Sequence, residues 1–420
     1  MANPRALYTV GLWLLLPYIF FHLLWRARKQ PEYLRHIPER FGFYTIHSNK
    51  PVIWLHTVSV GETRAAASLV QRLRETWPDH QLLLTHTTPT GRAASDQLYG
   101  GDVLRVYLPY DYPFAVRRFL NHFRPRIGVL LETEIWFNLI HACHAEEIPL
   151  LLLNARLSEK SAQGYARVAR LTRDALRELA AIAAQTTDDA ARLTSLGAGN
   201  IPVMGNLKFD IEPPPAMLEL GKELRRQFGM ERKVFLAAST REGEETLLLD
   251  ALMQVDMPQL LTVIVPRHPQ RFDEVATLLT RHGIRFQRRS ANQPVEPDTH
   301  VMLGDSMGEM FAYYAACDLA FIGGSLLPFG GQNLIEACAV GKPVLIGPHT
   351  YNFAQASQLA VASGAALRVQ GASGLAQTLQ NLLSSPVQLA EIGDAGLRFV
   401  NANRGSTEQA LLHISQFMTK

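Results

Sequence analysis

Residues 51–63 read PVIWLHTVSVGET, an apolar run that ends in a short polar turn and continues into a segment with helical spacing. Similar apolar runs return along the first half of the chain, beginning at Gln81 (QLLLTHT), Val103 (VLRVYL), Arg126 (RIGVLLE), Pro149 (PLLLLNA) and Ala181 (AIAAQ). Runs without strict alternation are typical of strands buried on both faces of a parallel sheet. Their alternation with helical segments predicts βαβ units in an open, doubly wound α/β sheet.

The second half of the chain repeats this pattern. Its apolar runs begin at Lys233 (KVFLAAST), Leu260 (LLTVIVP), Thr299 (THVMLG), Asp318 (DLAFIGG) and Lys342 (KPVLIG). Between the halves, Pro213–Pro215 favour a stiff, extended connector. We therefore predict an anchor helix with a basic flank over residues 1–30 and two Rossmann-like domains over 31–210 and 211–420. The last helix falls within 211–420, but we leave open that it packs back on the first domain. Because ligands bind at the carboxyl ends of strands in such sheets, the two domains are expected to face a cleft.

Composition limits the class of protein. A chain of 420 residues with 47% apolar residues suits two globular domains rather than one. Its formal net charge of only +3 argues against general binding of nucleic acid. The cysteines Cys143, Cys317 and Cys338 are too scattered for a disulfide framework or a zinc site, which favours a reducing compartment.

The N-terminus carries a membrane signal. Residues 6–25 read ALYTVGLWLLLPYIFFHLLW, and as a helix they would extend about 30 Å, roughly the thickness of the hydrocarbon layer. No small-residue cleavage site follows, which argues against a cleaved signal peptide. The basic residues that follow are Arg26, Arg28, Lys29, Arg35 and Arg40. They favour a single N-terminal anchor with a cytoplasmic body, while Pro17 and His22 leave open a helix that lies in one leaflet.

The segment HTVSVGET, residues 56–63, joins a predicted strand to a predicted helix. Gly61 is expected in the turn, with Glu62 near the helix N-terminus and facing the cleft. Such an acid either has a functional role or only stabilises the helix start by about a few tenths of a kcal/mol.

Two further segments place ionisable side chains beside the same domain's strands. In LLETEIWFN, Glu132 and Glu134 follow a strongly apolar strand, and buried acids are costly unless they are paired or used. Alternatively, one acid caps the next helix and the other pairs with a base. In GNLKFD, Lys208 could reach the cleft or form a neutralising pair with Asp210.

Four loops of the second half predict an anion-binding wall at the strand ends. They begin at Ala238 (ASTREGEE), Pro266 (PRHPQR), Met307 (MGE) and Gly323 (GGSLLPFGGQNLIEA). Glycines allow close approach of the backbone, and helix N-termini favour phosphate. Arg267 suits phosphate, and Glu336 could accept from ribose hydroxyls. The dinucleotide fingerprint GxGxxG and the P-loop are both absent, which argues against NAD and ATP.

Taken in order, these motifs resemble those of bacterial 3-deoxy-D-manno-octulosonic acid (Kdo) transferases. The resemblance runs essentially end to end and includes VSVGET, LPYD (108–111), ETEIW, NARLS (154–158), LKFD, PRHP, GDSMGE and GGSLLPFGGQN. It implies an α/β fold of the GT-B type and inverting transfer of Kdo from CMP-Kdo to lipid IV-A, a lipid A precursor, in lipopolysaccharide biosynthesis. It also implies no cofactor or essential metal and attachment to the cytoplasmic face of the inner membrane.

The resemblance also implies roles for single residues. Glu62 corresponds to the general base, and Glu132 and Lys208 correspond to positions that stabilise the transition state. The residues that correspond to CMP contacts are Pro266, Arg267, Met307, Gly308, Glu309, Asn333, Leu334, Ile335 and Glu336. The chain departs from the family at Gln332, where His is frequent; glutamine keeps a hydrogen-bond donor and an acceptor but does not titrate. Two alternatives stay open: a transferase that uses another nucleotide sugar, and a non-catalytic nucleotide-binding protein tethered to a membrane.

Overall fold

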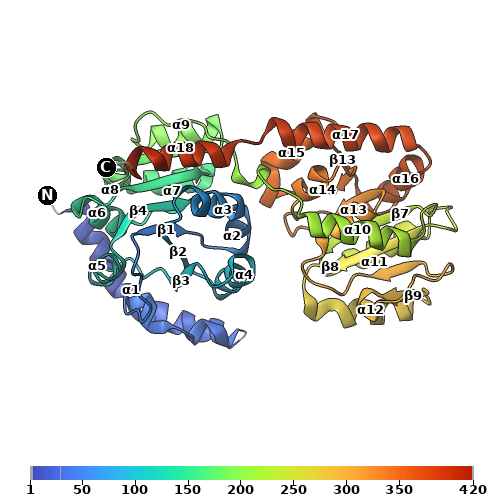
Figure 1. The fold of residues 1–420 in the computed structure, drawn as a ribbon, viewed down its shortest axis with the longest axis horizontal. Helices are drawn as coiled ribbons and strands as arrows, with labels where there is room; N and C mark the ends of the chain where they lie inside the picture. The colour runs from blue at the N-terminus through green and yellow to red at the C-terminus, as the bar shows by residue number, and fades with distance from the viewer. Residues whose placement is uncertain (1–2, 29, 419–420) are drawn as a thin grey trace. The chain divides into compact units, whose positions relative to one another are not determined.

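The structure, a computed structural model, describes residues 3–28 and 30–418, so Lys29 of the basic flank lies outside the described residues. The chain divides into two compact units: Met1–Asp210 with Asn403–Lys420, and Ile211–Ala402. Each unit holds one parallel sheet with helices packed on its faces (Figure 1). The predicted α/β organisation of both halves is therefore confirmed.

The sheet of the first unit has the strand order β3-β2-β1-β4-β5-β6, and its described strand pairs are all parallel. Its strands are β1 (Val52–His56), β2 (Gln81–His86), β3 (Leu104–Tyr107), β4 (Pro125–Leu131), β5 (Leu150–Ala155) and β6 (Ala181–Ala184). Strand β1 is buried along its whole length because helices cover both sides of it. The order reverses between β1 and β4, which makes their carboxyl ends the topological switch point of the sheet.

Most β-strands of the first unit lead through a short turn into a helix. They are α1 (Pro4–Ala27), α2 (Val60–Ala65), α3 (Ala67–Thr76), α4 (Pro89–Tyr99), α5 (Pro113–Phe123), α6 (Phe137–Ala145), α7 (Glu159–Ala166), α8 (Ala169–Glu178), α9 (Thr187–Ser195) and α18 (Ser406–Met418), with 3₁₀ turns η1 (Pro31–Leu34), η2 (Ile37–Phe41) and η3 (Leu207–Phe209). A Ser or Thr side chain accepts from the first turn of several of these helices: Ser59 of α2, Thr88 of α4, Ser158 of α7 and Thr186 of α9. These N-caps fix the point at which each strand turns into its helix.

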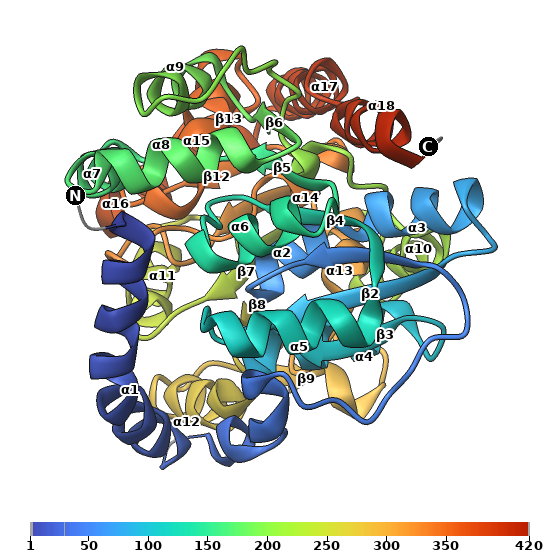
Figure 2. The same ribbon diagram turned by 90° about the vertical axis from the view of Figure 1, so that its left-hand side faces the viewer.

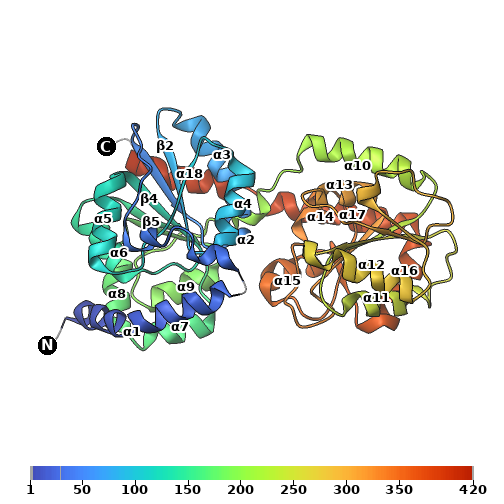
Figure 3. The ribbon, with the colours of Figure 1, turned by 90° about the horizontal axis from the view of Figure 1, so that it is seen from below.

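Helix α1 covers the predicted apolar stretch and extends it at both ends. It is long and apolar enough to cross a membrane, judged by length and composition alone. Its N-terminal half nevertheless packs against α6 and α8 of the first unit (Figures 2 and 3). The Tyr8 hydroxyl donates to the buried carboxylate of Asp111 at 3.0 Å, and the Tyr112 hydroxyl donates to the Leu12 carbonyl at 2.7 Å.

The sheet of the second unit has the order β13-β12-β11-β7-β8-β10-β9 and is also parallel. Its strands are β7 (Val234–Thr240), β8 (Leu261–Pro266), β9 (Phe286–Arg288), β10 (Val301–Leu303), β11 (Leu319–Ile322), β12 (Val344–Ile346) and β13 (Ala366–Arg368). The edge strands β9 and β13 were not predicted, because each is short and partly exposed and so lacks an apolar run. The switch point of this sheet lies between β7 and β11.

The helices of the second unit are α10 (Pro215–Phe228), α11 (Glu244–Leu252), α12 (Phe272–Arg281), α13 (Met310–Ala316), α14 (Ile335–Ala339), α15 (Ala354–Ala362), α16 (Gly371–Leu383) and α17 (Pro386–Ala402), with 3₁₀ turns η4 (Pro269–Arg271), η5 (Arg289–Ala291) and η6 (Tyr351–Phe353). The predicted proline connector is shorter than expected. Pro214 is extended, but Pro215 already opens α10, where proline is well accommodated.

Helix α18 belongs to the first unit. Its side chains Ala410, Leu411 and Ile414 join the core cluster on one face of that unit's sheet. Asp210 fixes its start, because the carboxylate accepts from the amides of Gly405 at 2.7 Å and of Thr407. The chain therefore returns to the first unit after Ala402.

Candidate active site

Two acids follow the two strands that meet at the switch point of the first sheet. Glu62 lies in the first turn of α2, which follows β1 after a short turn, and Glu132 is the first residue after β4. Parallel pairing of β1 with β4 brings both strand ends to one edge. The structure thus brings together two of the acids singled out in the sequence.

Glu62 is held by its own turn. One carboxylate oxygen accepts from the Val58 amide at 2.7 Å and the other from the Ser59 hydroxyl at 2.8 Å, while Ser59 accepts from the Glu62 amide at 3.3 Å. This is close to a capping box, which stabilises a helix start. The same contacts also fix the direction of the carboxylate, so the structural role does not exclude a chemical one.

The surroundings of Glu62 change its acidity. Burial and the neighbouring Glu132 carboxylate raise the pKa of Glu62 from 4.5 to about 7. The hydrogen bonds from Val58 and Ser59 act in the opposite direction but do not outweigh these effects. A carboxylate with a pKa near neutrality is suited to take up a proton at physiological pH.

Glu132 forms an ion pair with Lys208, whose Nζ lies 2.9 Å from a carboxylate oxygen. Both side chains are largely shielded from solvent, at 18% exposure each. The backbone of Glu132 has a left-handed φ of 63°, a conformation that is uncommon outside glycine and often occurs at functional sites. The Asp210 carboxylate, the alternative partner raised by the sequence, accepts from the amides at the start of α18.

Glu134 lies in the same loop but has other partners. Its carboxylate accepts from the indole N–H of Trp136 at 2.5 Å and lies 3.7 Å from Nε2 of the buried His56. Neither Glu132 nor Glu134 caps α6, because the helix start at Trp136 has no side-chain cap. Of the alternatives raised by the sequence, pairing with a base applies to Glu132, whereas the expected cap is wrong.

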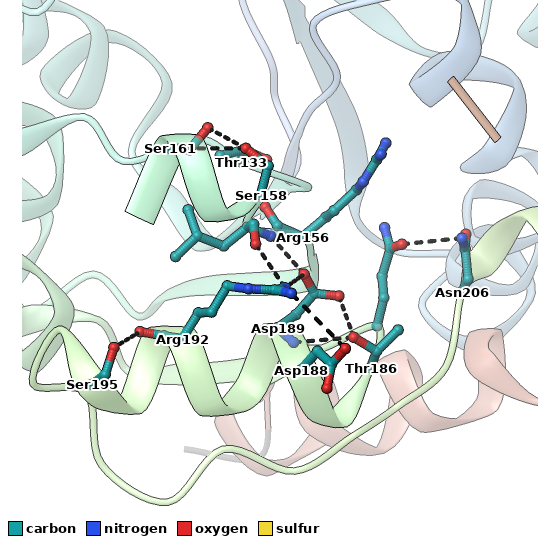
Figure 4. A network of polar contacts seen from close by, with 12 residues as sticks. Thr133, Arg156, Ser158, Ser161, Thr186, Asp188, Asp189, Arg192, Ser195 and Asn206 are labelled. Carbon is teal, nitrogen blue, oxygen red and sulfur yellow. Dashed lines mark hydrogen bonds and ion pairs between the residues drawn. The ribbon is translucent and has the colours of Figure 1, made fainter. Parts of the chain in front are cut away.

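A polar network supports the loop that carries Glu132. The hydroxyl of Thr133 donates to the carbonyl of Arg156 in the loop after β5. Asp189 of α9 then holds that loop, because its carboxylate accepts from the Leu157 amide at 2.8 Å and from the Thr186 hydroxyl at 2.6 Å. Figure 4 shows these groups converging while the Arg156 side chain points away. The NARLS segment thus helps to position the acidic loop.

In the second unit, Pro266 ends β8 and Arg267 follows it. The Arg267 Nε donates to the side-chain oxygen of Gln332 at 3.1 Å, so the loops after β8 and β11 are in direct contact. Gly323 allows the close approach of the β7 and β11 ends, since a Cβ there would lie 2.4 Å from the Ser239 carbonyl oxygen. Gln332, noted in the sequence only as a departure, therefore orients Arg267.

The segment from Asn333 to Glu336 opens α14. The Asn333 amide donates to the Glu336 carboxylate at 3.1 Å and its oxygen accepts from the Ile335 amide at 3.1 Å. Leu334 and Ile335 are buried, so they present backbone rather than side chain at this helix start. Glu336 lies in the first turn, as the sequence predicted.

The loop after β10 contains Met307, Gly308 and Glu309. Met307 is exposed at 55%, and Gly308 has a φ of 84°, which other residues adopt only with strain. The Glu309 carboxylate accepts from Ser306 at 2.7 Å and pairs with Arg289 at 3.2 Å. The three residues therefore form an ordered loop with an accessible apolar side chain.

The acids of the ASTREGEE segment have structural partners. Glu244 accepts from the amides of Gly324 at 2.5 Å and Leu326 at 3.0 Å, which fixes the glycine-rich loop. Glu245 forms a buried ion pair with Arg271 at 2.6 Å. Among the described residues, no group of three or more His, Cys, Asp or Glu side chains could hold a metal ion.

Neither the role of Ser59 nor the burial of Arg40 was predicted from the sequence. Ser59 holds Glu62, and the S-x-x-E spacing of Ser59 and Glu62 is a capping-box signal that could have found it. Arg40 was noted only as part of the basic flank, yet its guanidinium is buried. Nothing in the sequence predicts that burial.

A fold with two parallel sheets, one in each unit, is shared with solved structures. A glycosyltransferase from Rickettsia africae aligns with a TM-score of 0.59 at 15% identity, covering 88% of this chain and 99% of that chain. The Anabaena protein HepE in complex with UDP aligns with a TM-score of 0.58 at 16% identity, covering 87% and 100%. At these identities the likeness shows the fold alone, which is the two-domain α/β fold of the GT-B type.

Sequence comparison identifies the family. The family described as 3-Deoxy-D-manno-octulosonic-acid transferase (kdotransferase) matches residues 35–211. The 3-deoxy-D-manno-octulosonic acid transferase of Bordetella pertussis is 42% identical, covering 97% of this chain and 98% of that protein. That of Haemophilus influenzae is 36% identical, covering 97% of each. The chain that carries the Glu62 and Arg267 loops therefore belongs to the 3-deoxy-D-manno-octulosonic acid transferase family of glycosyltransferases.

Proposed function

We propose that the protein transfers Kdo from CMP-Kdo to lipid IV-A with inversion at the anomeric carbon, without a cofactor or an essential metal. The observation that carries this proposal is the setting of Glu62. Its carboxylate is oriented by Val58 and Ser59, and burial together with Glu132 raises its pKa to about 7. An acceptor hydroxyl needs such a base, because its own proton must leave as the new bond forms.

In the proposed reaction, Glu62 removes the proton from a sugar hydroxyl of the acceptor. The hydroxyl oxygen bonds to the anomeric carbon of Kdo while the bond from that carbon to the phosphate oxygen of CMP breaks. The electron pair of that bond leaves with CMP, and the proton stays on Glu62. A single displacement of this kind inverts the anomeric carbon.

Glu132 and Lys208 are proposed to act on charge in the transition state. The ion pair at 2.9 Å places a cation next to the acid that faces Glu62. When Glu62 takes up the proton, its repulsion with Glu132 ends, so proton transfer relieves an unfavourable interaction. Lys208 then offers positive charge to the anionic sugar as its bond to CMP lengthens.

The second unit is proposed to hold the CMP part of the donor. Arg267 is suited to the phosphate because guanidinium groups form paired, charge-assisted hydrogen bonds with it. Glu336 is placed to accept from ribose hydroxyls, and Pro266, Met307, Gly308, Glu309 and Asn333 to Ile335 are proposed as further contacts. Contact between Arg267 and Gln332 supports this assignment, because it fixes the guanidinium before the donor arrives.

The protein is proposed to act at the cytoplasmic face of the inner membrane, with α1 as its anchor. The outward side of α1 exposes large apolar side chains, including Leu14 at 78%, Phe21 at 68% and Trp25 at 57%. The opposite side of its N-terminal half is tied to the body through Tyr8 and Thr9. A helix held along the body in this way suits the interface of one leaflet better than a free span.

Incubation of the purified protein with CMP-Kdo and lipid IV-A, followed by mass spectrometry of the product, tests the proposal. We expect a mass increase by one or more Kdo units and release of CMP. UDP- and ADP-sugars serve as alternative donors, and transfer from one of these instead would contradict the donor assignment. CMP binding without turnover in the presence of both substrates would leave only the non-catalytic alternative.

A further inference from the structure

A pocket of about 280 Å³ lies within the first unit, beside the carboxyl ends of β2, β3 and β4. One wall is the second half of α1, and the opposite wall is formed by the loops that follow these strands. Arg26, Tyr33, Arg40, Tyr110 and Trp136 line it. The pocket therefore combines two arginines with aromatic side chains and contains no acidic lining residue.

Arg40 is the unusual member of this lining. Its side chain is only 4% exposed, and it donates to the Thr87 carbonyl at 3.2 Å and stacks on Tyr107, with the guanidinium carbon 4.1 Å from the ring centroid. Its Nε has no hydrogen-bond partner, and among the described residues no Asp or Glu forms an ion pair with it. A buried cation without a counterion is costly, so the site is built to receive an anion.

The neighbouring acid does not supply that counterion. Glu39 pairs with Arg92 at 2.7 Å and accepts from the Tyr107 amide at 2.7 Å. Its carboxylate is therefore already committed to other donors. Contact of Arg40 with the Tyr107 ring offsets part of the cost of burial but neutralises no charge.

The pocket adjoins the acidic site. Thr88 lines the pocket, and its hydroxyl donates to the Val58 carbonyl at 2.9 Å, while the Val58 amide binds Glu62. Trp136 lines the pocket and donates to Glu134. A ligand bound here would thus lie at the edge that carries the proposed base.

The pocket also adjoins the apolar surface of α1. Tyr18, another lining residue, is 64% exposed, and Trp25 and Phe21 on the same helix are exposed to a similar degree. Arg26 lies at the rim, with its guanidinium carbon 5.4 Å from the centre of the Tyr33 ring. A molecule held by its acyl chains next to α1 could place an anionic headgroup at this rim.

We infer that this pocket binds a phosphate group of the anionic glycolipid acceptor, with Arg40 as its main ligand and Arg26 at the entrance. Phosphate suits the pair because arginine binds it through several charge-assisted hydrogen bonds at once. The inference rests on the proposed function for the identity of the acceptor. Within that function, it assigns a site that selects acceptors by their phosphate and orients the sugar toward Glu62.

The test compares two acceptors and two arginines in the full-length protein. Lipid IV-A and the same glycolipid after removal of its phosphates are presented in neutral detergent micelles with saturating CMP-Kdo. Arg40→Gln should raise KM for the phosphorylated acceptor by roughly 10- to 100-fold, the loss expected for charge-assisted hydrogen bonds. It should change KM for the dephosphorylated acceptor by less than about threefold and leave CMP affinity unchanged, while Arg40→Lys should recover part of the effect.

Arg118→Gln is the matched control. Arg118 also stacks on an aromatic ring, that of Phe43 at 4.1 Å, and donates to a backbone carbonyl, but it does not line the pocket. We expect KM values within twofold of wild type for both acceptors. If Arg40→Gln proves unstable by thermal unfolding, Arg26→Gln at the exposed rim should give a smaller loss with the same dependence on phosphate.

Equal losses with both acceptors would overturn the inference, because Arg40 would then have only a structural role. Binding to vesicles of neutral phospholipid separates this result from a failure of the proposed function. Vesicles that contain lipid IV-A should bind wild type more tightly than Arg40→Gln even without a donor. Two results would show a general anion site and contradict selection of the acceptor. One is that wild type binds vesicles with phosphatidic acid as tightly as vesicles with lipid IV-A. The other is that millimolar inorganic phosphate alone displaces it from the lipid IV-A vesicles.

Discussion

Replacement of Glu62 by Gln should slow Kdo transfer by at least about 100-fold and at the same time stabilise the first unit at alkaline pH. The reason lies in the raised pKa of Glu62, which burial and Glu132 move from 4.5 to about 7. An acid with a raised pKa contributes stability that is fully present below pH 4.5 and is lost as the pH rises through 7. Gln resembles the neutral acid and does not undergo this loss.

The magnitude follows from the pKa difference. At about 1.4 kcal/mol per pKa unit, a rise from 4.5 to about 7 corresponds to at most about 3 kcal/mol at pH 8. For a unit of this size about 1 kcal/mol moves the unfolding temperature by roughly 2–4 °C, so Glu62→Gln should raise it by up to about 6–12 °C at pH 8. Near pH 4.5 the two proteins should unfold at nearly the same temperature.

Tryptophan fluorescence can follow this unit selectively, because Trp13, Trp25, Trp54, Trp77 and Trp136 are all of the chain's tryptophans and all lie in it. Unfolding temperatures at pH 4.5 and pH 8 test the predicted gain in stability. The pH dependence of kcat/KM tests the predicted role of Glu62 as the base. The wild-type rate should fall about tenfold per pH unit below about 7.

Glu75→Gln is the matched control for Glu62→Gln. Glu75 is an acid of α3 in the same unit, but hydrogen bonds from Gln71 and Arg72 lower its pKa. It should show no gain in unfolding temperature at pH 8 and no change in rate. A Glu62→Gln protein that is less stable at pH 8 than wild type would refute the reasoning, because the carboxylate would then act mainly as a helix cap. A rate within threefold of wild type would remove Glu62 from the mechanism.

Three further changes test other parts of the site. Lys208→Met removes the cation that pairs with Glu132, so the Glu132 carboxylate should repel the Glu62 carboxylate more strongly and raise the pKa of Glu62. The acid limb of the kcat/KM profile should then move to higher pH, and an unchanged profile would contradict coupling between the two acids. Arg267→Ala should weaken CMP binding by roughly 10- to 100-fold in calorimetric titration, without an effect on acceptor binding; the reverse pattern would exchange the roles of the two units. Deletion of residues 1–25 should release the protein from membranes and lower the stability of the body by about 1–3 kcal/mol, because buried Asp111 loses a donor; an unchanged unfolding temperature would argue against docking of α1.

The strand pattern could be predicted because burial on both faces leaves a direct trace in the sequence. Strand β1 is apolar except for its last residue, His56, and is buried throughout. The edge strand β9, Phe286–Arg288, is only partly buried on every residue, so no apolar run marks it. Central strands can therefore be predicted from their apolar runs. Edge strands form by pairing with an adjacent strand, and the local sequence does not indicate that pairing.

In the candidate site, contacts between residues near in the sequence could be predicted, whereas contacts between distant residues could not. The position of Glu62 could be predicted because Ser59 and Val58, which hold it, lie within four residues. The partner of Lys208 could not, because Glu132 lies 76 residues away and Asp210 was the nearer acid. Only the fold decides between them, by using Asp210 to cap α18 and leaving Lys208 to Glu132.

Helix α1 illustrates why a membrane signal is incomplete as structural information. Its hydropathy indicates that most of its side chains are apolar, but it does not indicate that Tyr8 and Thr9 form hydrogen bonds with the rest of the first unit. Asp111, the partner of Tyr8, also accepts from the amides of Asn138 and Leu139 at the start of α6. Helix α6 in turn follows the loop of Glu132 and Glu134. One buried carboxylate thus connects the apolar helix to the scaffold of the acidic loop, and any tilt of α1 must be transmitted to that scaffold or break these hydrogen bonds.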